Sequence, residues 1–435
     1  PLVAVGKGKG GPNFAPLLTV PNSLRDDARV LFIDQRRTVA QHQTWARGSM
    51  LARLLEPARR ELDQVELTEG WTHADEFSER YREAMEALRT PRVQEIERLV
   101  SETTRRTLAF LGSETVDDLR IEFGFSDPAN PFRGIRLNYV EGGFVLPAEE
   151  LGSGIQSAIV IGVFEAFRQL GASVGTVLIE EPEMYLHPQA QRYLYGLFTE
   201  LADNGQAQVV CSTHSPVFGD LRRFEAIRLI HREPGASTSV RSVARDEDRT
   251  FLRRRRKRRK LEPILHMSEV LFARRALLVE GTGDAIAASM AAEEIGLDLD
   301  AEDYSVVACG SKASIPFVAR LCRALEIPIT VLHDTDIWEL PDDPDDRAEA
   351  EKKNAKEREL NDAIREAVCD DSRIFRIEPS LEAALGIGRN ASDKPQRIAA
   401  ALEALPFETW PQPLRKAVAQ LSAGGRDHAR MRLEG

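Results

Sequence analysis

The amino-acid sequence predicts an α/β protein in which helices cover parallel β-sheets. The first observation is a set of short apolar runs, at 176–181, 207–215, 276–280 and 328–333, each with the length and composition of a buried strand. The second is that segments with helical spacing of apolar residues lie between such runs, an order typical of parallel strands. The third is the length of 435 residues, which predicts more than one domain.

The overall composition is that of an ordinary soluble protein, because 42% of the residues are hydrophobic and 29% are charged. No apolar run approaches the ~20 residues that a helix needs to cross a bilayer, so we expect no membrane segment. The four cysteines lack the paired spacing of metal sites, and we expect reduced thiols and a cytoplasmic location. The net charge of −11 argues against a uniformly basic nucleic-acid-binding protein.

The elements of residues 1–245 fit a first domain. A short buried strand is expected within 29–37, and apolar residues at three- and four-residue spacing predict a helical segment over 40–112. Besides the apolar runs already named, further strands that complete this domain are expected at 117–125, 135–147, 224–233 and 237–245.

The segment 246–270 is expected to be a basic linker helix, and its run RRRRKRRK at 253–260 concentrates eight positive charges. This run is either a DNA-binding strip or a solvated linker, because like charges repel unless an anion relieves them. Residues 271–435 are expected to form a second domain of alternating strands and helices with a helical carboxyl-terminal extension. Its remaining elements are a strand at 304–309 and helices at 284–295 and 313–325.

Two strand ends in the first domain carry residues suited to phosphate chemistry. Glu180 and Glu181 end the run TVLIEE, where one carboxylate can hold Mg²⁺ through water while the next orients the attacking water. His214 ends the following run, where it can contact a terminal phosphate. Upstream, Ser153 and Gly154 open a helix whose free N–H groups can bind an anion.

The order LGSG, EEPE, LHP and STHSP resembles the signature loop, Walker B strand, D-loop and switch histidine of ABC-type ATPases. The likeness is strongest to the overcoming-lysogenization-defect (OLD) family and its relatives. It implies that ATP binds at the residues just named, with Glu181 catalytic. Two positions depart from the pattern: Glu180 stands where an aspartate is usual, and Gly152 stands where the signature serine is expected.

A Walker A loop is not found in the sequence. Such a loop needs Gly-x-x-x-x-Gly-Lys-Ser/Thr, and no lysine of this chain is followed by serine or threonine. Either the loop lies upstream of Pro1, so that the ATPase domain is truncated at its amino end, or the ATPase is degenerate. We favour truncation, since ABC-type domains carry the loop near their amino terminus, and we expect residues 1–435 alone to hydrolyse ATP negligibly.

Strand ends in the second domain carry another group of candidate residues. Glu280 follows the run ALLV, Gly310 follows SVVAC, and Asp334 and Asp336 follow ITVLH. The carboxyl ends of parallel strands meet at one sheet edge, so we expect the three carboxylates to converge. Carboxylates at such short distances repel one another unless a divalent cation neutralises them. The pattern therefore predicts a metal site.

This pattern resembles the Toprim domain, a Rossmann-like fold that binds Mg²⁺ for strand cleavage or nucleotidyl transfer in topoisomerases and primases. The added acid in VEGTGD matches the form found in OLD-family nucleases, and the resemblance spans about 110–400. It implies two Mg²⁺ or Mn²⁺ ions. The implied metal ligands are Glu280, Asp284, Asp334, Asp336 and Glu382, with Lys394 as the cation that stabilises the transition state. From the local sequence alone, a position on the surface explains Glu382 and Lys394 about as well as a role in the site does.

The two resemblances together imply a metal-dependent DNA endonuclease of the OLD type, an ATPase joined to a two-metal Toprim nuclease. Family members commonly pair, so a homodimer is expected, with the helices of 40–112 as its interface or as internal packing. Phage defence is the family expectation, and a helicase partner stays an open question.

Two other functions are compatible with the sequence. One is an ATP-driven DNA-binding or regulatory protein that binds metal without cutting, and the other is a topoisomerase- or primase-like nucleotidyl transferase. No tyrosine stands out as the attacking group of a topoisomerase, since Tyr304 begins an expected strand and fits a core position. Hydrolysis is therefore favoured.

Overall fold

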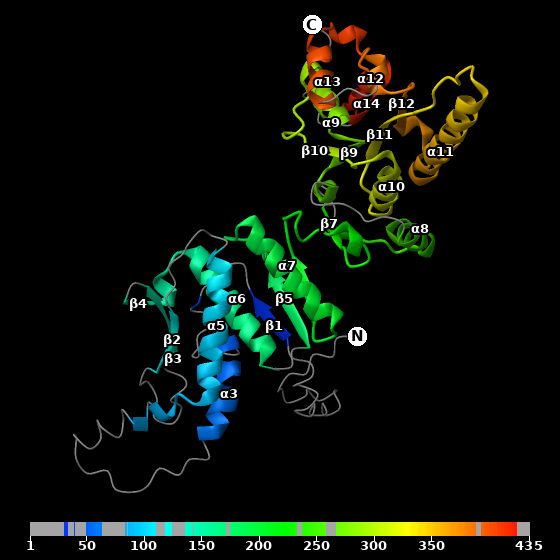
Figure 1. The fold of residues 1–435 in the computed structure, drawn as a ribbon. Helices are drawn as coiled ribbons and strands as arrows, with labels where there is room; N and C mark the ends of the chain where they lie inside the picture. Colours follow the sequence, from blue (N-terminus) through cyan, green and yellow to red (C-terminus); the bar gives the residue numbers. More distant parts are fainter. Residues whose placement is uncertain are drawn as a thin grey trace, which may run out of the picture. The chain divides into compact units, whose positions relative to one another are not determined.

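A computed structural model describes most of the chain (Figure 1), namely residues 30–33, 39, 49–62, 83–84, 86–109, 118–123, 135–141, 143–170, 175–232, 237–257, 267–388 and 393–423. The chain divides into two compact units, Pro1–Phe218 and Gly219–Gly435. Each unit has its own hydrophobic core and is described by itself. The division lies upstream of the domain boundary that we expected at residue 245.

The first unit contains a three-stranded parallel sheet in the order β1-β5-β6. Its strands are β1 (Val30–Ile33), β5 (Thr176–Glu180) and β6 (Gln208–Ser212), which confirms three predicted strands. The register pairs Glu180 with Ser212, so the segments that follow β5 and β6 leave the sheet at the same edge. This edge carries the first group of candidate residues.

Helices pack on this unit's sheet and on one another. They are α3 (Met50–Leu62), α5 (Pro91–Ala109), α6 (Ser153–Gln169) and α7 (Pro188–Asp203). The apolar face of α5 packs against α6 within the unit's core, as expected if the helical segment serves internal packing. Much of the expected helical segment, including residues 63–82, lies outside the described residues.

An antiparallel sheet in the order β2-β3-β4 completes the first unit. Its strands are β2 (Asp118–Phe123), β3 (Ile135–Glu141) and β4 (Phe144–Pro147), followed by the short helix η2 (Ala148–Glu150). The alternating segments of the sequence are therefore strands, as predicted. Tyr139 and Leu137 on β3 are buried in the unit's core, whereas the apolar side chains of β4 are exposed.

The strands β7 (Leu229–His231) and β8 (Ser239–Arg241) form a two-stranded antiparallel sheet of their own. The sequence placed these two strands in the first domain, and the structure pairs them with each other alone. The residues around them, Leu221, Phe224 and Val243, are buried in the core of the second unit. These three apolar side chains hold the hairpin to the second unit.

The helix α8 (Asp246–Lys257) covers the first part of the expected linker helix. Its Asp248 is 1% exposed and pairs with Arg320, and its Leu252 is fully buried in the core of the second unit. This part of the segment is therefore docked rather than free. Residues 258–266, with the end of the basic run, lie outside the described residues.

A four-stranded parallel sheet in the order β10-β9-β11-β12 forms the centre of the second unit. The strands are β9 (Arg275–Val279), β10 (Tyr304–Ala308), β11 (Ile329–Asp334) and β12 (Ile374–Ile377). Alternate residues of β9 enter two different cores, Leu277 on one face and Leu278 on the other. Burial on both faces explains why this strand reads as an uninterrupted apolar run.

Helices cover both faces of this sheet (Figure 1). One face packs against α9 (Thr282–Glu294), α13 (Lys394–Glu403) and α14 (Gln412–Ser422), and the other against α10 (Ile315–Ala324) and α11 (Pro344–Val368). The carboxyl-terminal helices thus belong to the core of the unit. Short helical turns complete it: η3 (Leu221–Arg223), η4 (Met267–Leu271), η5 (Lys312–Ser314), η6 (Asp371–Arg373), α12 (Leu381–Ala384) and η7 (Phe407–Thr409). Within the described ranges, no helix has the length and apolar character needed to span a membrane.

The packing of α5 on α6 gives a test of the fold. A Cβ atom at Gly162 would lie 2.5 Å from Thr104 Oγ1 and 2.9 Å from the Val100 carbonyl oxygen, both on α5. We therefore predict that Gly162→Ala lowers the free energy of unfolding by about 1–3 kcal/mol, as overpacked cores do. Chemical denaturation followed by circular dichroism measures this change.

Gly196 on α7 supplies the matched control, because a Cβ there would meet no atom within 4 Å. Gly196→Ala should raise the free energy of unfolding by about 0.5–1 kcal/mol, the difference in helix propensity. Equal effects of the two substitutions would contradict the packing described here.

Candidate functional site

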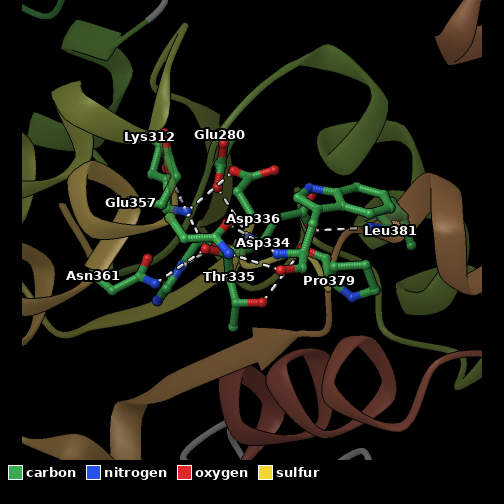
Figure 2. Close-up of polar contacts among 12 residues, drawn as sticks. Glu280, Lys312, Asp334, Thr335, Asp336, Glu357, Asn361, Pro379 and Leu381 are labelled. Carbon is green, nitrogen blue, oxygen red and sulfur yellow. Dashed lines mark hydrogen bonds and ion pairs between the residues drawn. The ribbon is translucent and has the colours of Figure 1, made fainter. Parts of the chain in front are cut away.

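The second unit gathers carboxylates at the carboxyl edge of its parallel sheet, as Figure 2 shows for those that β9 and β11 supply. Glu280 follows β9, and Asp334 ends the neighbouring strand β11. The backbone N–H of Asp334 donates to Glu280 Oε1 over 3.0 Å. The prediction that these two acids converge is confirmed by this hydrogen bond between adjacent strand ends.

Two helix starts face the same carboxylates. The carboxylate of Asp334 accepts a hydrogen bond of 3.0 Å from the backbone N–H of Leu381, the first residue of α12. Asp284 lies in the first turn of α9, and its Oδ2 accepts the N–H of Gly281 over 2.9 Å. Free N–H groups at a helix start favour a negative charge, so both acids lie where the backbone helps to hold them.

Asp336 belongs to the loop after β11 and has a left-handed backbone, with φ of 54°. Its N–H donates to the carbonyl of Pro379 over 2.8 Å. Its side chain is about one-third exposed and pairs with Lys312, whose Nζ lies 3.1 Å from Asp336 Oδ2. Asp336 is thus the more open of the two acids of the Asp-x-Asp motif, because Asp334 is buried.

Burial and neighbouring negative charges raise the pKa values of three of these acids. Burial, followed by the charges of Asp284 and Glu280, raises the pKa of Asp334 to about 9. Burial raises the pKa of Glu280 to about 8, although the Lys312 ammonium acts in the opposite direction. The pKa of Asp284 rises to about 6, again mainly through burial. Near neutral pH the cluster therefore retains protons.

Carboxylates whose pKa values are raised by burial and by one another suit a hard divalent cation, which would replace the protons that they retain. Within the described ranges, no three Asp, Glu, His or Cys side chains stand in a ready-made metal-holding arrangement. The acids instead meet through backbone hydrogen bonds and charge. The donor set nevertheless fits Mg²⁺ or Mn²⁺ in its chemistry.

The remaining predicted pair also lies close to the cluster. Lys394 Nζ donates to Glu382 Oε1 over 2.7 Å, and the charge of Glu382 contributes to the raised pKa of Asp284. Burial alone would raise the pKa of Glu382, but its hydrogen bond from Lys394 and other contacts lower it below the ordinary value. Glu382 and Lys394 are thus neighbours of the cluster rather than separate surface residues.

Three polar residues of this edge were missed in the sequence. Lys312 is 5% exposed and reaches the loop after β11, and from α11 Asn361 reaches the same loop while Glu357 pairs with Lys312 (Figure 2). Lys312 lies two residues beyond Gly310, at the end of a predicted strand, and this position was a usable signal. Glu357 and Asn361 lie in a strongly charged helical stretch, where nothing in the sequence distinguishes them from solvated residues.

At the sheet edge of the first unit, Glu181 and His214 also come together. The N–H of Glu181 donates to the Ser212 carbonyl over 2.9 Å, and His214 Nε2 lies 4.0 Å from Glu181 Oε1. The His214 side chain is 84% exposed, so it is accessible to a ligand. Glu180 ends β5 and is exposed.

Glu183 organises this edge and was not predicted. It accepts hydrogen bonds from Thr213 Oγ1 over 2.8 Å and from the backbone N–H of His214 over 2.6 Å. It therefore holds the loop after β6 against the loop after β5. Its position in EEPE was the available signal, since the motif contains a third acid.

Ser153 and Gly154 begin α6, as the sequence predicted for the helix start. Ser153 is exposed, and no hydrogen bond among the described residues joins it to Glu181 or His214. The helix start and the Glu181–His214 pair thus belong to separate elements of the unit.

Comparison with known proteins agrees with the division of the chain into two units. Residues 25–218 match the AAA ATPase domain family, and residues 271–336 match the overcoming lysogenization defect protein-like TOPRIM domain. The chain is similar to an OLD nuclease of Thermus scotoductus, with 49% identity over 405 residues that cover 92% of this chain and 75% of that protein. It is also 23% identical to the Old nuclease of Escherichia phage P2 over 161 residues, which cover 37% of this chain and 27% of that protein.

Among solved structures, the C-terminal region of the Burkholderia pseudomallei OLD protein aligns with 34% of this chain and 97% of its own length. The TM-score is 0.21 at 18% identity. The family assignment comes from the Thermus scotoductus relative, because its identity of 49% extends over 92% of this chain. The resemblance inferred from the motifs is confirmed: the chain belongs to the OLD nuclease family.

Proposed function

We propose that this chain is an endonuclease that hydrolyses DNA phosphodiester bonds with two divalent cations, Mg²⁺ or Mn²⁺, and that ATP regulates or drives it. The observation that carries this proposal is the edge of the second unit's sheet, where the half-buried Glu280 and Asp284 lie with the buried Asp334 and all three carboxyl groups have raised pKa values. Perturbed groups of this kind gather at functional sites.

The metal ligands in this proposal are Glu280, Asp334 and Asp336, with Asp284 serving a second ion. Bound divalent cations supply an activated water and stabilise the departing 3′ oxygen of a phosphodiester. Glu280 and Asp334 give up their protons to bind cations, and the backbone N–H of Leu381 keeps the Asp334 carboxylate in place. Lys394, whose side chain is 42% exposed, is the cation available to the DNA phosphate.

Hydrolysis is preferred to strand passage because a topoisomerase needs a tyrosine that can attack DNA. Tyr304 is 4% exposed at the start of β10, so it serves the core. Supercoiled plasmid with Mg²⁺ or Mn²⁺ separates the possible functions. Nicked and linear products indicate a nuclease, relaxed closed circles a topoisomerase, and unchanged plasmid a DNA-binding regulator.

For the first unit, we propose that ATP binds near the carboxyl edge of its sheet. Glu181 would orient the attacking water, His214 would contact the terminal phosphate, and Glu180 would hold Mg²⁺. The 4.0 Å separation of Glu181 and His214 supports a shared task. Ser153 and Gly154 would bind phosphate through the start of α6, in a homodimer.

Asp334→Ala and Asp336→Ala should each reduce plasmid cleavage by at least about 100-fold, because a missing carboxylate weakens cation binding. Glu280→Ala should behave alike, whereas Asp284→Ala should reduce cleavage less, since it serves only the second ion. Gel electrophoresis of plasmid products measures the rates. EDTA should stop cleavage by the parent protein, and added Mg²⁺ or Mn²⁺ should restore it.

Asp342→Ala is the control for this series, since Asp342 is an exposed acid of the same loop region. It should cleave at the parent rate. If the Asp334→Ala protein is folded by circular dichroism and cleaves like the control, Asp334 does not hold a catalytic metal.

Asp334→Asn should stabilise the metal-free protein more at pH 8 than at pH 5. Folding raises the pKa of Asp334 from its ordinary value of 3.8 to about 9, so the folded state favours the protonated acid. The stability of the folded state therefore falls as pH rises between these values, and the uncharged amide removes that loss. Thermal melting in EDTA at both pH values measures it, with Asp342→Asn as the control. An equal gain at both pH values would contradict this prediction.

Replacing Arg253, Arg254, Arg255 and Arg256 by alanine should weaken DNA binding at low salt without sequence bias. Arg253 and Arg254 are exposed on α8, and each lost phosphate contact reduces the salt dependence of affinity. The slope of log K against log salt should become shallower by up to about 3–4. Fluorescence anisotropy with a labelled duplex measures affinity and slope.

The control replaces Lys352, Lys353, Lys356 and Arg358 of α11 by alanine, since these exposed residues carry the same charge. It separates a local contact from an effect of net charge. Equal loss in both proteins would show that the four arginines act only through net charge and do not form a DNA-binding strip.

A further inference from the structure

Lys312 is a buried cation beside the carboxylate cluster, and it has no part in the function proposed above. It begins η5, just after Gly310 at the end of β10, and its side chain is 6% exposed. A buried ammonium is costly unless each of its three donors finds an acceptor. Its contacts therefore show what it does.

Three acceptors surround the Lys312 ammonium (Figure 2). They are the Thr335 carbonyl oxygen at 2.9 Å, Glu357 Oε2 at 3.0 Å and Asp336 Oδ2 at 3.1 Å. The three come from β11's following loop and from α11. All donors of the ammonium can thus be satisfied within one shell, which allows the charge to remain inside the protein.

The peptide between Thr335 and Asp336 is fixed from several sides. Asn361 Nδ2 also donates to the Thr335 carbonyl, over 3.1 Å, so this oxygen accepts two hydrogen bonds. The N–H groups of Thr335 and Asp336 donate to the carbonyls of Ile377 and Pro379. Asp336 holds a left-handed backbone within this network, a conformation that non-glycine residues rarely adopt.

Residues of α11 reach this loop from one helix face. Glu357 and Asn361 are four residues apart, and Asn354, three residues before Glu357, exchanges two hydrogen bonds with the backbone of Trp338. The exposed remainder of α11 is strongly charged. One polar face of α11 therefore contacts the loop that carries Asp336 through Asn354 and Asn361, and contacts Lys312 through Glu357.

We infer that Lys312, held by Glu357, is a positioning residue that aims the Asp336 carboxylate into the metal site. This inference rests on the proposed function, since Asp336 is a ligand only if the edge binds cations. Lys312 itself is too buried to touch DNA, so it acts through Asp336. Partners that hydrogen-bond a ligating carboxylate fix its direction, and their loss typically weakens metal affinity by about 10–100-fold.

The test measures Mn²⁺ binding to the full chain by isothermal titration calorimetry. Lys312→Met should raise the dissociation constant for Mn²⁺ by about 10-fold or more, and Glu357→Gln should raise it by less. In an Asp336→Asn background, Lys312→Met should have no further effect, because the residue through which it acts is already changed. A purely structural role would give the same added loss in both backgrounds.

Matched controls come from the same helix. Lys353→Met and Glu359→Gln remove exposed charges of α11 and should leave Mn²⁺ affinity at the parent value. Because Lys312→Met leaves Glu357 without its partner, the double variant Lys312→Met/Glu357→Gln is measured as well. It removes both charges of the pair, and it should show the same weakened affinity in a folded protein.

Two results would overturn the inference and are distinguishable. If the parent binds Mn²⁺ and the folded Lys312 variants bind it equally well or more tightly, Lys312 does not position Asp336. If the parent neither binds Mn²⁺ nor cleaves plasmid, the proposed metal-dependent function fails, and the inference fails with it.

Discussion

The crowding of carboxylates at one edge of a buried sheet determines the contacts that surround this edge in the second unit. Strands β9 and β11 bring Glu280 and Asp334 within one hydrogen bond of each other, and Asp334 is buried there. Carboxylates in such a place must be protonated, paired with a cation, or held by backbone N–H groups. The unit uses all three: raised pKa values, the ammonium of Lys312, and the amide of Leu381.

Both units place acids at the carboxyl edge of a parallel sheet, but the two edges differ in how exposed their side chains are. In both, acids follow parallel strands and meet the segment after a neighbouring strand. In the first unit His214 is widely exposed, and Glu183 ties the two loops together through hydrogen bonds. In the second unit Asp334 is buried and bonded by the start of α12, Asp284 lies in the first turn of α9, and α11 contacts Lys312 through Glu357. The first edge is open to a ligand that arrives from solution, and the second is built around charge that is already present.

Strand-end acids were predictable because apolar runs mark buried strands, and parallel strands end at a common edge. Strand β12 was not predicted, since IFRI is short and carries an arginine. The hairpin of β7 and β8 was placed in the first domain, because its alternating pattern does not encode which core it faces. Glu357 and Asn361 were out of reach, since their role depends on where a charged helix packs and not on local spacing.

The packing of α14 has a consequence for the order in which the protein is made. This helix, Gln412–Ser422, packs against β9, β11 and β12, and buries Leu414, Val418 and Leu421 there. A ribosome that has just completed Glu382 has translated every acid proposed as a metal ligand, yet one face of their sheet still lacks its last helix. The sheet that brings these acids together is thus covered on that face only after translation has passed Ser422, and a nascent chain that stalls before α14 carries the acids without this packing.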